Sequence, residues 1–272
     1  EEPEKDMSVI SGKEIWESHF TAKPGDMIIS FSDGVIHAGI GRLINLGWKR
    51  VNVMEFIQRN YRPHISARVM TKDLVSVCDH LYEGEPGDDT TVAAVHIMPR
   101  TTTRVMVGPA SSPDMDAKQV RDLILTSGKK VVCGGTTSKI VARELGQKID
   151  VELKYYDEEV PPTAHIEGID LVTEGILTLS AAEKRMKEYL DEYEDNVRKK
   201  EILDLDKKDG ATKLVRLLVE ECTDVVFMMG QANNPAHQNL DAPVSLNIKV
   251  RIVQNIATML EKLGKHAEVE YY

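Results

Sequence analysis

Apolar runs alternate with helix-like patterns through the second half of the chain. The helical segments repeat apolar positions every three or four residues, whereas the runs between them are short and nearly continuous. Strands are predicted at 104–108, 129–135, 151–156, 168–175, 224–230 and 267–272, and helices at 116–126, 136–145, 180–200 and 244–263. Alternating strands and helices indicate βαβ units, so this half is expected to be an α/β domain with a mostly parallel sheet.

The first hundred residues show a mixed α+β pattern instead. Apolar residues on both sides of Ser11 and Gly12 predict a hairpin, and Val51, Met54 and Ile57 repeat at helical spacing. The predicted elements after the hairpin are a strand at 27–31, helices at 51–60 and 67–82, and a buried strand at 90–97.

The pattern changes at residues 98–103, which read as a junction between two domains. The sequence therefore predicts one domain over 1–100 and a second over 101–272. A length of 272 residues is enough for two domains of ordinary size.

Composition narrows the classes of function. The net charge of −10 argues against a surface for nucleic acid or anionic membranes, because both reward clustered Lys and Arg. The three cysteines are far apart in the chain, so we expect reduced thiols. No apolar stretch reaches the roughly 20 residues of a membrane span, and the N-terminus lacks the pattern of a signal peptide. A soluble, cytoplasmic protein is expected.

Carboxylates stand at the ends of two predicted strands. Asp33 follows the strand 27–31, and Asp88 and Asp89 precede the strand 90–97. Divalent ions such as Mg²⁺ and Mn²⁺ prefer oxygen ligands, and aspartates on neighbouring strand ends can bridge two such ions. The alternative is that Asp33-Gly34 is a simple turn and that Asp88 and Asp89 belong to a polar loop.

The two motifs together resemble a known family. The stretch "GDMIISFSDGV", followed about 50 residues later by "GDDTTVAAV", resembles metal-dependent protein serine/threonine phosphatases of type 2C, in their bacterial branch of the stage II sporulation protein E type. The resemblance covers residues 9–97. It implies a signalling enzyme that hydrolyses phosphoserine or phosphothreonine on a partner protein, with a two-metal site of Mn²⁺ or Mg²⁺. It also implies a phosphatase-type β-sandwich with flanking helices, of which this chain holds a part.

Site residues follow from the same resemblance. Asp33 and Asp88 fall at the positions of metal ligands and catalytic residues, and Gly34 and Asp89 lie beside them in the metal-binding motifs.

One feature departs from the family pattern. The family has an earlier metal-binding Asp-Gly turn, but here no Asp-Gly precedes Asp33, and the other one, Asp209-Gly210, lies in a charged stretch. Together with the missing starting Met, this favours a fragment carrying the later half of a catalytic domain. Such a chain is expected to bind the metal pair poorly and to turn over slowly or not at all. The alternative is a non-catalytic ligand-sensing or docking protein on a degenerate phosphatase scaffold.

Glycine turns mark a second candidate site, in the second half. Three predicted strands end in glycine followed by polar side chains, and ligands in open α/β sheets bind outside the carboxyl ends of strands. The candidate ligand-binding residues are Gly134, Gly135, Thr136, Thr137, Glu174, Asn233 and Asn234, with His237 as a weaker one. They suggest a pocket for a small polar or phosphorylated ligand in a regulatory domain, or an independent enzyme acting on such a ligand. An ordinary βα turn with a helix cap is the alternative.

The charged helix expected near 181–201 reads as a solvated face and as a possible contact between copies in a homo-oligomer.

Overall fold

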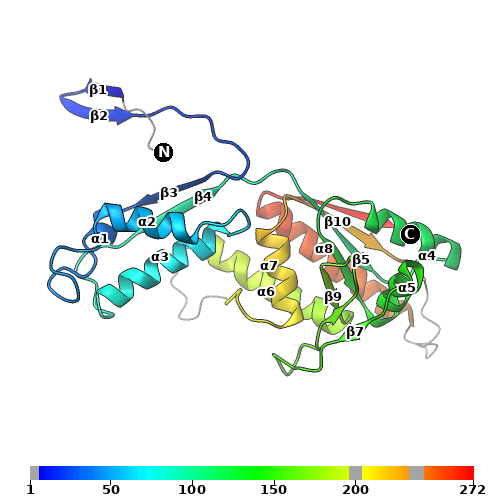
Figure 1. Ribbon diagram of the computed structural model, residues 1–272. Helices are drawn as coiled ribbons and strands as arrows, with labels where there is room; N and C mark the ends of the chain where they lie inside the picture. Colours follow the sequence, from blue (N-terminus) through cyan, green and yellow to red (C-terminus); the bar gives the residue numbers. More distant parts are fainter. Residues whose placement is uncertain (1–5, 196–203, 233–241) are drawn as a thin grey trace. The chain divides into compact units, whose positions relative to one another are not determined.

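A computed structural model describes residues 6–195, 204–232 and 242–272 (Figure 1). The chain divides into two compact units, Glu1–Pro99 and Arg100–Tyr272. Both mix helices and strands, so the molecule as a whole is α+β with one large, mostly parallel sheet. Among the described residues, no helix is both long enough and apolar enough to span a membrane.

The first unit contains two small antiparallel sheets and three helices. A hairpin joins β1 to β2 through Ser11 and Gly12, both with positive φ, as a two-residue hairpin turn requires. This confirms the predicted hairpin. The elements are β1 (Asp6–Ile10), β2 (Lys13–Glu17), β3 (Met27–Phe31), α1 (Asp33–Ile36), α2 (Arg50–Asn60), α3 (Ala67–Leu81) and β4 (Val92–His96).

The strands β3 and β4 form a two-stranded sheet that packs on α2 and α3 through one face (Figure 1). Met27, Ile29 and Phe31 point toward the helices, whereas Ile28 and Val95 on the other face are 38% and 57% exposed. The prediction of a buried strand at 90–97 is therefore wrong for the outer face, because the described helices of the first unit cover this sheet on one face alone. The two-sheet sandwich implied by the family resemblance stays a prediction.

The two predicted helices of this unit are present, but in α2 the predicted apolar face is right for Ile57, which packs on the core, and wrong for Val51. Val53 is buried and Val51 is 68% exposed, although the sequence places Val51 on the apolar face. In α3 the predicted residues Met70, Leu74 and Cys78 form the core of the unit. A short helix whose apolar residues lie on more than one side fixes its inward face weakly, so tertiary packing decides it.

The second unit is built on a seven-stranded sheet in the order β11-β10-β5-β6-β9-β8-β7. Its strands are β5 (Thr102–Val107), β6 (Lys130–Cys133), β7 (Asp150–Val151), β8 (Ala164–His165), β9 (Leu171–Thr173), β10 (Asp224–Met229) and β11 (His266–Tyr271). Its helices are α4 (Pro113–Ile124), α5 (Gly135–Leu145), α6 (Ile176–Asp195), α7 (Gly210–Glu220) and α8 (Ala242–Lys262). The parallel α/β pattern predicted for this half is confirmed.

Five strands of this sheet are parallel, and their order is that of a doubly wound α/β fold. Numbered along the chain, they lie in the order third, second, first, fourth and fifth across the sheet. Two buried clusters cover the two faces: α4 and α5 pack on one face, and α6, α7 and α8 pack on the other. Coverage on both faces explains why the central strands are continuous apolar runs.

Two segments of the second unit differ from the sequence prediction. The strand expected at 151–156 ends at Val151, and Leu153 and Tyr155 beyond it are 90% and 66% exposed. These apolar residues have no sheet face to pack on. The helix α7 was not predicted, although Asp209 caps it and its apolar face is buried.

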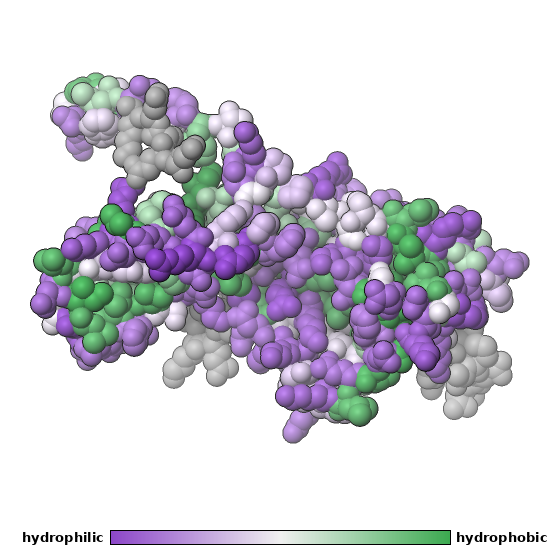
Figure 2. Space-filling model, viewed as in Figure 1, coloured by the Kyte–Doolittle hydropathy of each residue, from purple (hydrophilic) through white to green (hydrophobic). Residues whose placement is uncertain are grey.

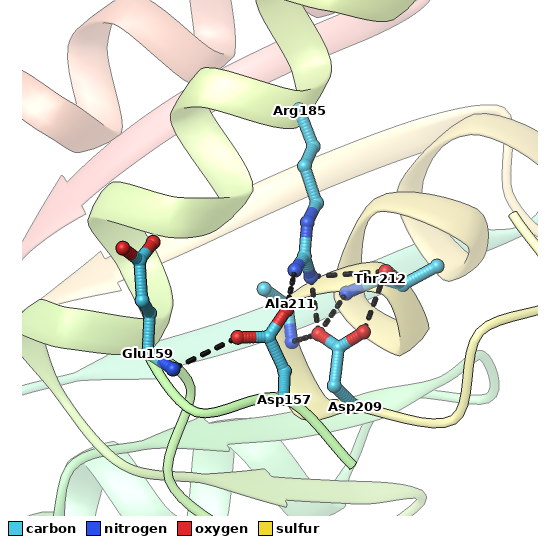
Figure 3. Close-up of polar contacts among 6 residues, drawn as sticks. All are labelled: Asp157, Glu159, Arg185, Asp209, Ala211 and Thr212. Atoms are coloured by element: carbon cyan, nitrogen blue, oxygen red, sulfur yellow. Dashed lines mark hydrogen bonds and ion pairs between the residues drawn. The ribbon is translucent and has the colours of Figure 1, made fainter. Parts of the chain in front are cut away.

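Arg185 of α6 joins three segments of the second unit (Figure 3). Its guanidinium pairs with Asp209, which caps α7, and donates 2.7 and 2.9 Å hydrogen bonds to Asp157 and to the Thr212 hydroxyl. The Asp209 carboxylate also accepts hydrogen bonds from the main-chain N–H groups of Ala211 and Thr212, both at 3.0 Å. A buried charge network therefore holds α6, α7 and the loop after β7 together.

All three cysteines are free thiols buried inside the two units. Burial raises the pKa of both Cys78 and Cys133 to about 11, so these side chains stay neutral at physiological pH.

Candidate metal centre

The pairing of β3 with β4 brings the two carboxylate motifs together. The strands are antiparallel and Phe31, the last residue of β3, pairs with Val92, the first residue of β4. The chain that leaves β3 and the chain that enters β4 therefore lie side by side. This register places Asp33 next to Asp88, although 55 positions separate them in the sequence.

Ser32 links the two motifs to each other through hydrogen bonds. Its main-chain N–H donates to the Thr91 carbonyl at 3.0 Å, which extends the ladder by one residue. Its hydroxyl donates to the Asp89 carbonyl at 2.7 Å and accepts from the Thr91 N–H at 2.9 Å. Ser32 precedes α1 in the N-cap position, but its hydroxyl serves the neighbouring segment and not the helix.

Gly34 lets the two chains approach closely. A Cβ atom at this position would lie 2.5 Å from the Asp89 carbonyl oxygen, which real Cβ atoms do not reach. The Gly34 carbonyl accepts a 2.8 Å hydrogen bond from the Tyr82 hydroxyl at the end of α3. Burial raises the pKa of Tyr82, and the charges of Asp88 and Asp33 act in the same direction, so the phenol stays protonated as a donor.

Three side chains converge at this place: Asp33, His37 and Asp88. Each offers a ligand atom, and these atoms all lie within 4.8 Å of one another. All three residues are exposed. Among the residues that the structure describes, this is the group of His, Cys, Asp or Glu side chains whose spacing suits a metal ion.

His37 was not among the residues predicted from the sequence. No helix was expected at this point, whereas the chain enters the short helix α1 at Asp33. The His37 N–H donates to the Asp33 carbonyl at 2.9 Å, which completes a helical turn and places both side chains on one face. The spacing Asp-x-x-x-His was the available signal, but it has meaning only if the segment is helical.

The other two predicted residues of this site contribute main-chain groups. Asp89 is outside the converging group, and its carbonyl accepts the Ser32 hydroxyl. The Asp88 carboxylate accepts a 2.8 Å hydrogen bond from the Asp89 N–H, which orients it. Direct contacts of Gly34 or Asp89 with a metal stay predictions.

The donor set fits a divalent cation. Ligand atoms about 2.1 Å from an octahedral ion are about 3 Å apart when adjacent and about 4.2 Å apart when opposite. The spacing within 4.8 Å is close to these values, so small side-chain rotations suffice. Exposure of the three residues leaves room for the waters that Mg²⁺ and Mn²⁺ usually keep.

In the second unit, three of the predicted ligand-binding residues near the strand ends, Gly134, Thr137 and Glu174, have contacts within the fold. The Thr137 hydroxyl is buried and accepts the Gly108 N–H at 3.1 Å, and the Glu174 carboxylate accepts the Leu177 N–H at 3.1 Å at the start of α6. Gly134, with φ +116°, packs against Gly175. These contacts show that Thr137, Glu174 and Gly134 each stabilise the local fold. Thr136 is exposed, and its ligand role stays a prediction, as does the pocket. The predicted residues Asn233, Asn234 and His237 lie outside the described residues.

The strand ends at the switch point of the sheet, between β5 and β10, pack directly on each other. The Gly230 N–H donates to the Val107 carbonyl at 2.9 Å, and a Cβ at Gly230 would lie 2.0 Å from the Pro109 carbonyl oxygen. The two chains therefore stay paired just beyond the ends of β5 and β10, and the Ala232 N–H donates to the Pro109 carbonyl at 3.1 Å.

A groove of about 560 Å³ lies elsewhere in the second unit, beside α4. Its polar groups are paired with each other: Arg104 with Glu270 at 3.0 Å, and the Tyr272 hydroxyl with Asp122 at 3.0 Å. The predicted ligand-binding residues do not line it.

Gly135→Ala is expected to stabilise the second unit by about 0.4–1 kcal/mol. A Cβ at Gly135 meets nothing within 4 Å, and its φ is not in the left-handed region, so alanine reduces the entropy of the unfolded chain without strain. Urea unfolding followed by far-UV circular dichroism measures the change. The neighbouring Gly134→Ala is the control and should destabilise by about 1–2 kcal/mol, because alanine at φ +116° is strained. Equal effects at both positions would contradict this account of the turn.

Comparison with known proteins gives one family. Residues 2–98 match the family model described as Stage II sporulation protein E (SpoIIE), which confirms the resemblance predicted from the two motifs. No curated protein and no solved structure matches the chain. The matched segment, about a third of the chain, contains Asp33, His37 and Asp88, and it is this segment that is similar to the stage II sporulation protein E family.

Proposed function

We propose that the first unit carries part of the active site of a metal-dependent protein serine/threonine phosphatase. The observation that carries the proposal is the convergence of Asp33 and Asp88 across the β3–β4 pair, in a segment related to the stage II sporulation protein E family. The reaction is hydrolysis of phosphoserine or phosphothreonine on a partner protein.

Asp33 and Asp88 would hold Mn²⁺ or Mg²⁺. The bound ion supplies an activated water and binds phosphoryl oxygens. The protein's contribution is to fix the two carboxylates: Ser32 ties both motifs together, Gly34 permits their close approach, and the Asp89 N–H orients the Asp88 carboxylate. These supports position the ligands before the ion binds.

The described group supplies three ligand side chains, which is few for a pair of metal ions. We therefore propose that this chain carries the later half of the catalytic domain, and that a further acidic segment completes the two-metal site. The chain by itself then turns over slowly or not at all.

Exposed apolar side chains of the first unit favour contact with another protein surface. Trp16, Ile40, Leu43 and Leu46 are 49–69% exposed, and Figure 2 shows hydrophobic surface in green within this unit. Apolar surface bordered by polar residues is typical of protein contacts. Docking of a phosphoprotein substrate, and a regulatory or ligand-binding role for the second unit, are parts of the same proposal.

Turnover of a phosphoserine peptide by the 272-residue chain with Mn²⁺ tests this function. We expect slow but metal-dependent release of phosphate, reduced at least about tenfold by Asp33→Asn or Asp88→Asn, since loss of even an outer partner of a metal ligand costs about 10–100-fold. The exposed Asp79→Asn on α3 is the matched control and should keep the wild-type rate.

Two results would contradict the proposal. Metal-independent turnover, or turnover unaffected by both substitutions, would exclude this site as the catalytic one. Fast turnover, as for a complete phosphatase, would show that three ligand side chains suffice and would refute the need for a further segment.

A further inference from the structure

His37 adds a nitrogen to a site that the two aspartates alone would make from oxygen. It lies four residues after Asp33 at the C-terminal end of α1, and a ring nitrogen comes within 4.8 Å of carboxylate oxygens of both Asp33 and Asp88. The three residues thus offer two oxygens and one nitrogen.

The His37 side chain is free to act as a ligand. It is exposed, and among the residues that the structure describes its ring forms no hydrogen bond or ion pair with another side chain. Binding a cation through this ring therefore breaks no contact within the fold. The turn that carries it is fixed by the N–H bond to the Asp33 carbonyl.

The type of ligand decides the type of metal. Mg²⁺ and Ca²⁺ are hard ions that take oxygen ligands, whereas imidazole is a good ligand for first-row transition metals. Replacing one oxygen ligand by an imidazole nitrogen weakens the preference for Mg²⁺ and favours transition-metal ions.

We propose that His37 is a nitrogen ligand of this centre and makes it selective for first-row transition-metal ions over Mg²⁺ and Ca²⁺. The inference rests on the proposed role of Asp33 and Asp88 as metal ligands, and it adds a third ligand and a metal class to that role. It does not depend on whether the chain turns over substrate.

Electron spin-echo spectroscopy of Mn²⁺ bound to the full chain tests it, because a directly bound imidazole gives a ¹⁴N modulation that oxygen ligands lack. We expect this modulation in the wild type, its loss in His37→Ala, and its retention in His64→Ala, an exposed histidine before α3. Competition titrations should show a preference for Mn²⁺ over Mg²⁺ that falls about tenfold in His37→Ala. Circular dichroism should be unchanged, because His37 is exposed.

The outcomes separate the two proposals. If Asp33→Asn and Asp88→Asn abolish Mn²⁺ binding but the wild type shows no ¹⁴N modulation, His37 is not a ligand and the carboxylate centre stands. Modulation that survives in His37→Ala also overturns the inference. If the wild type does not bind Mn²⁺ at millimolar concentration, the metal centre itself fails, and the proposed function with it.

Discussion

Arg185→Met is expected to destabilise the second unit by about 3–5 kcal/mol, the cost of removing one partner from a buried ion pair. The side chain of Asp209 is 2% exposed and that of Arg185 is 13% exposed, so neither charge is well solvated. Methionine keeps the aliphatic volume but leaves the carboxylates of Asp157 and Asp209 without their shared cation. The helices α6 and α7 and the loop after β7 lose their common contact (Figure 3).

Equilibrium urea unfolding followed by far-UV circular dichroism measures this loss. Both tryptophans, Trp16 and Trp48, lie in the first unit, so their fluorescence reports that unit separately. The matched control is Arg216→Met on α7, whose side chain is 36% exposed and forms a 3.9 Å ion pair with Glu221, itself 39% exposed. An exposed pair contributes about 0–1 kcal/mol, so this variant should change little. Equal losses in the two variants would refute a special role for the buried network.

The same network predicts a pH dependence. Burial alone would raise the pKa of Asp209, but hydrogen bonds from Thr212 and Arg185 and the Arg185 charge outweigh it and hold the pKa below the ordinary value of 3.8. A lowered pKa gives stability that is fully present above about pH 3.8 and is lost as the pH falls through the folded-state pKa. In Arg185→Met the folded-state pKa rises, so the difference in stability between wild type and variant should shrink as the pH falls from the folded-state pKa of the variant to that of the wild type. A constant difference from pH 7 to pH 3 would contradict this.

Long patterned segments could be predicted from the sequence, and the reasons are visible in the fold. The central strands of the second unit are buried on both faces, so their apolar runs were unmistakable, as in β10 from Asp224 to Met229. The strand β3 was predicted with its observed bounds because a turn precedes it and Ser32 follows it. Leu153 is one reason why a strand was wrongly predicted at 151–156. In the sequence, an exposed apolar residue such as Leu153 cannot be told apart from one that is buried on a sheet face.

Only some residues of the candidate site could be predicted from the sequence. Asp33 and Asp88 could be singled out because each adjoins a strand end and a glycine, and their proximity follows from antiparallel pairing. His37 could not, because its value depends on one helical turn that the sequence gives no reason to expect. The helix α7 was not predicted for a similar reason. Asp209 was assigned to a charged stretch of the sequence, but it is the buried N-cap of this helix.

Gly34→Ala is expected to weaken metal binding as much as the loss of the most important outer partner of a metal ligand would. The added Cβ would lie 2.5 Å from the Asp89 carbonyl oxygen and 3.0 Å from its carbon, and both are backbone atoms that cannot rotate away. The segment before β4 must move, so the Ser32–Asp89 hydrogen bond is lost and Asp88 is displaced from Asp33. We expect Mn²⁺ affinity to fall about 100-fold and stability to fall by about 1–3 kcal/mol, as for an overpacked site.

A matched control for this variant lies on the same loop. Gly87 is next to Asp88, but a Cβ there would meet just the Tyr82 ring at 3.7 Å, an ordinary contact. Gly87→Ala should therefore bind Mn²⁺ like the wild type in a titration followed by electron paramagnetic resonance, while Gly34→Ala should not. Thermal unfolding followed by the buried Trp48 separates lost affinity from lost folding. If Gly34→Ala folds and binds Mn²⁺ as tightly as Gly87→Ala, then the close approach of the two motifs is not what holds Asp33 and Asp88 together.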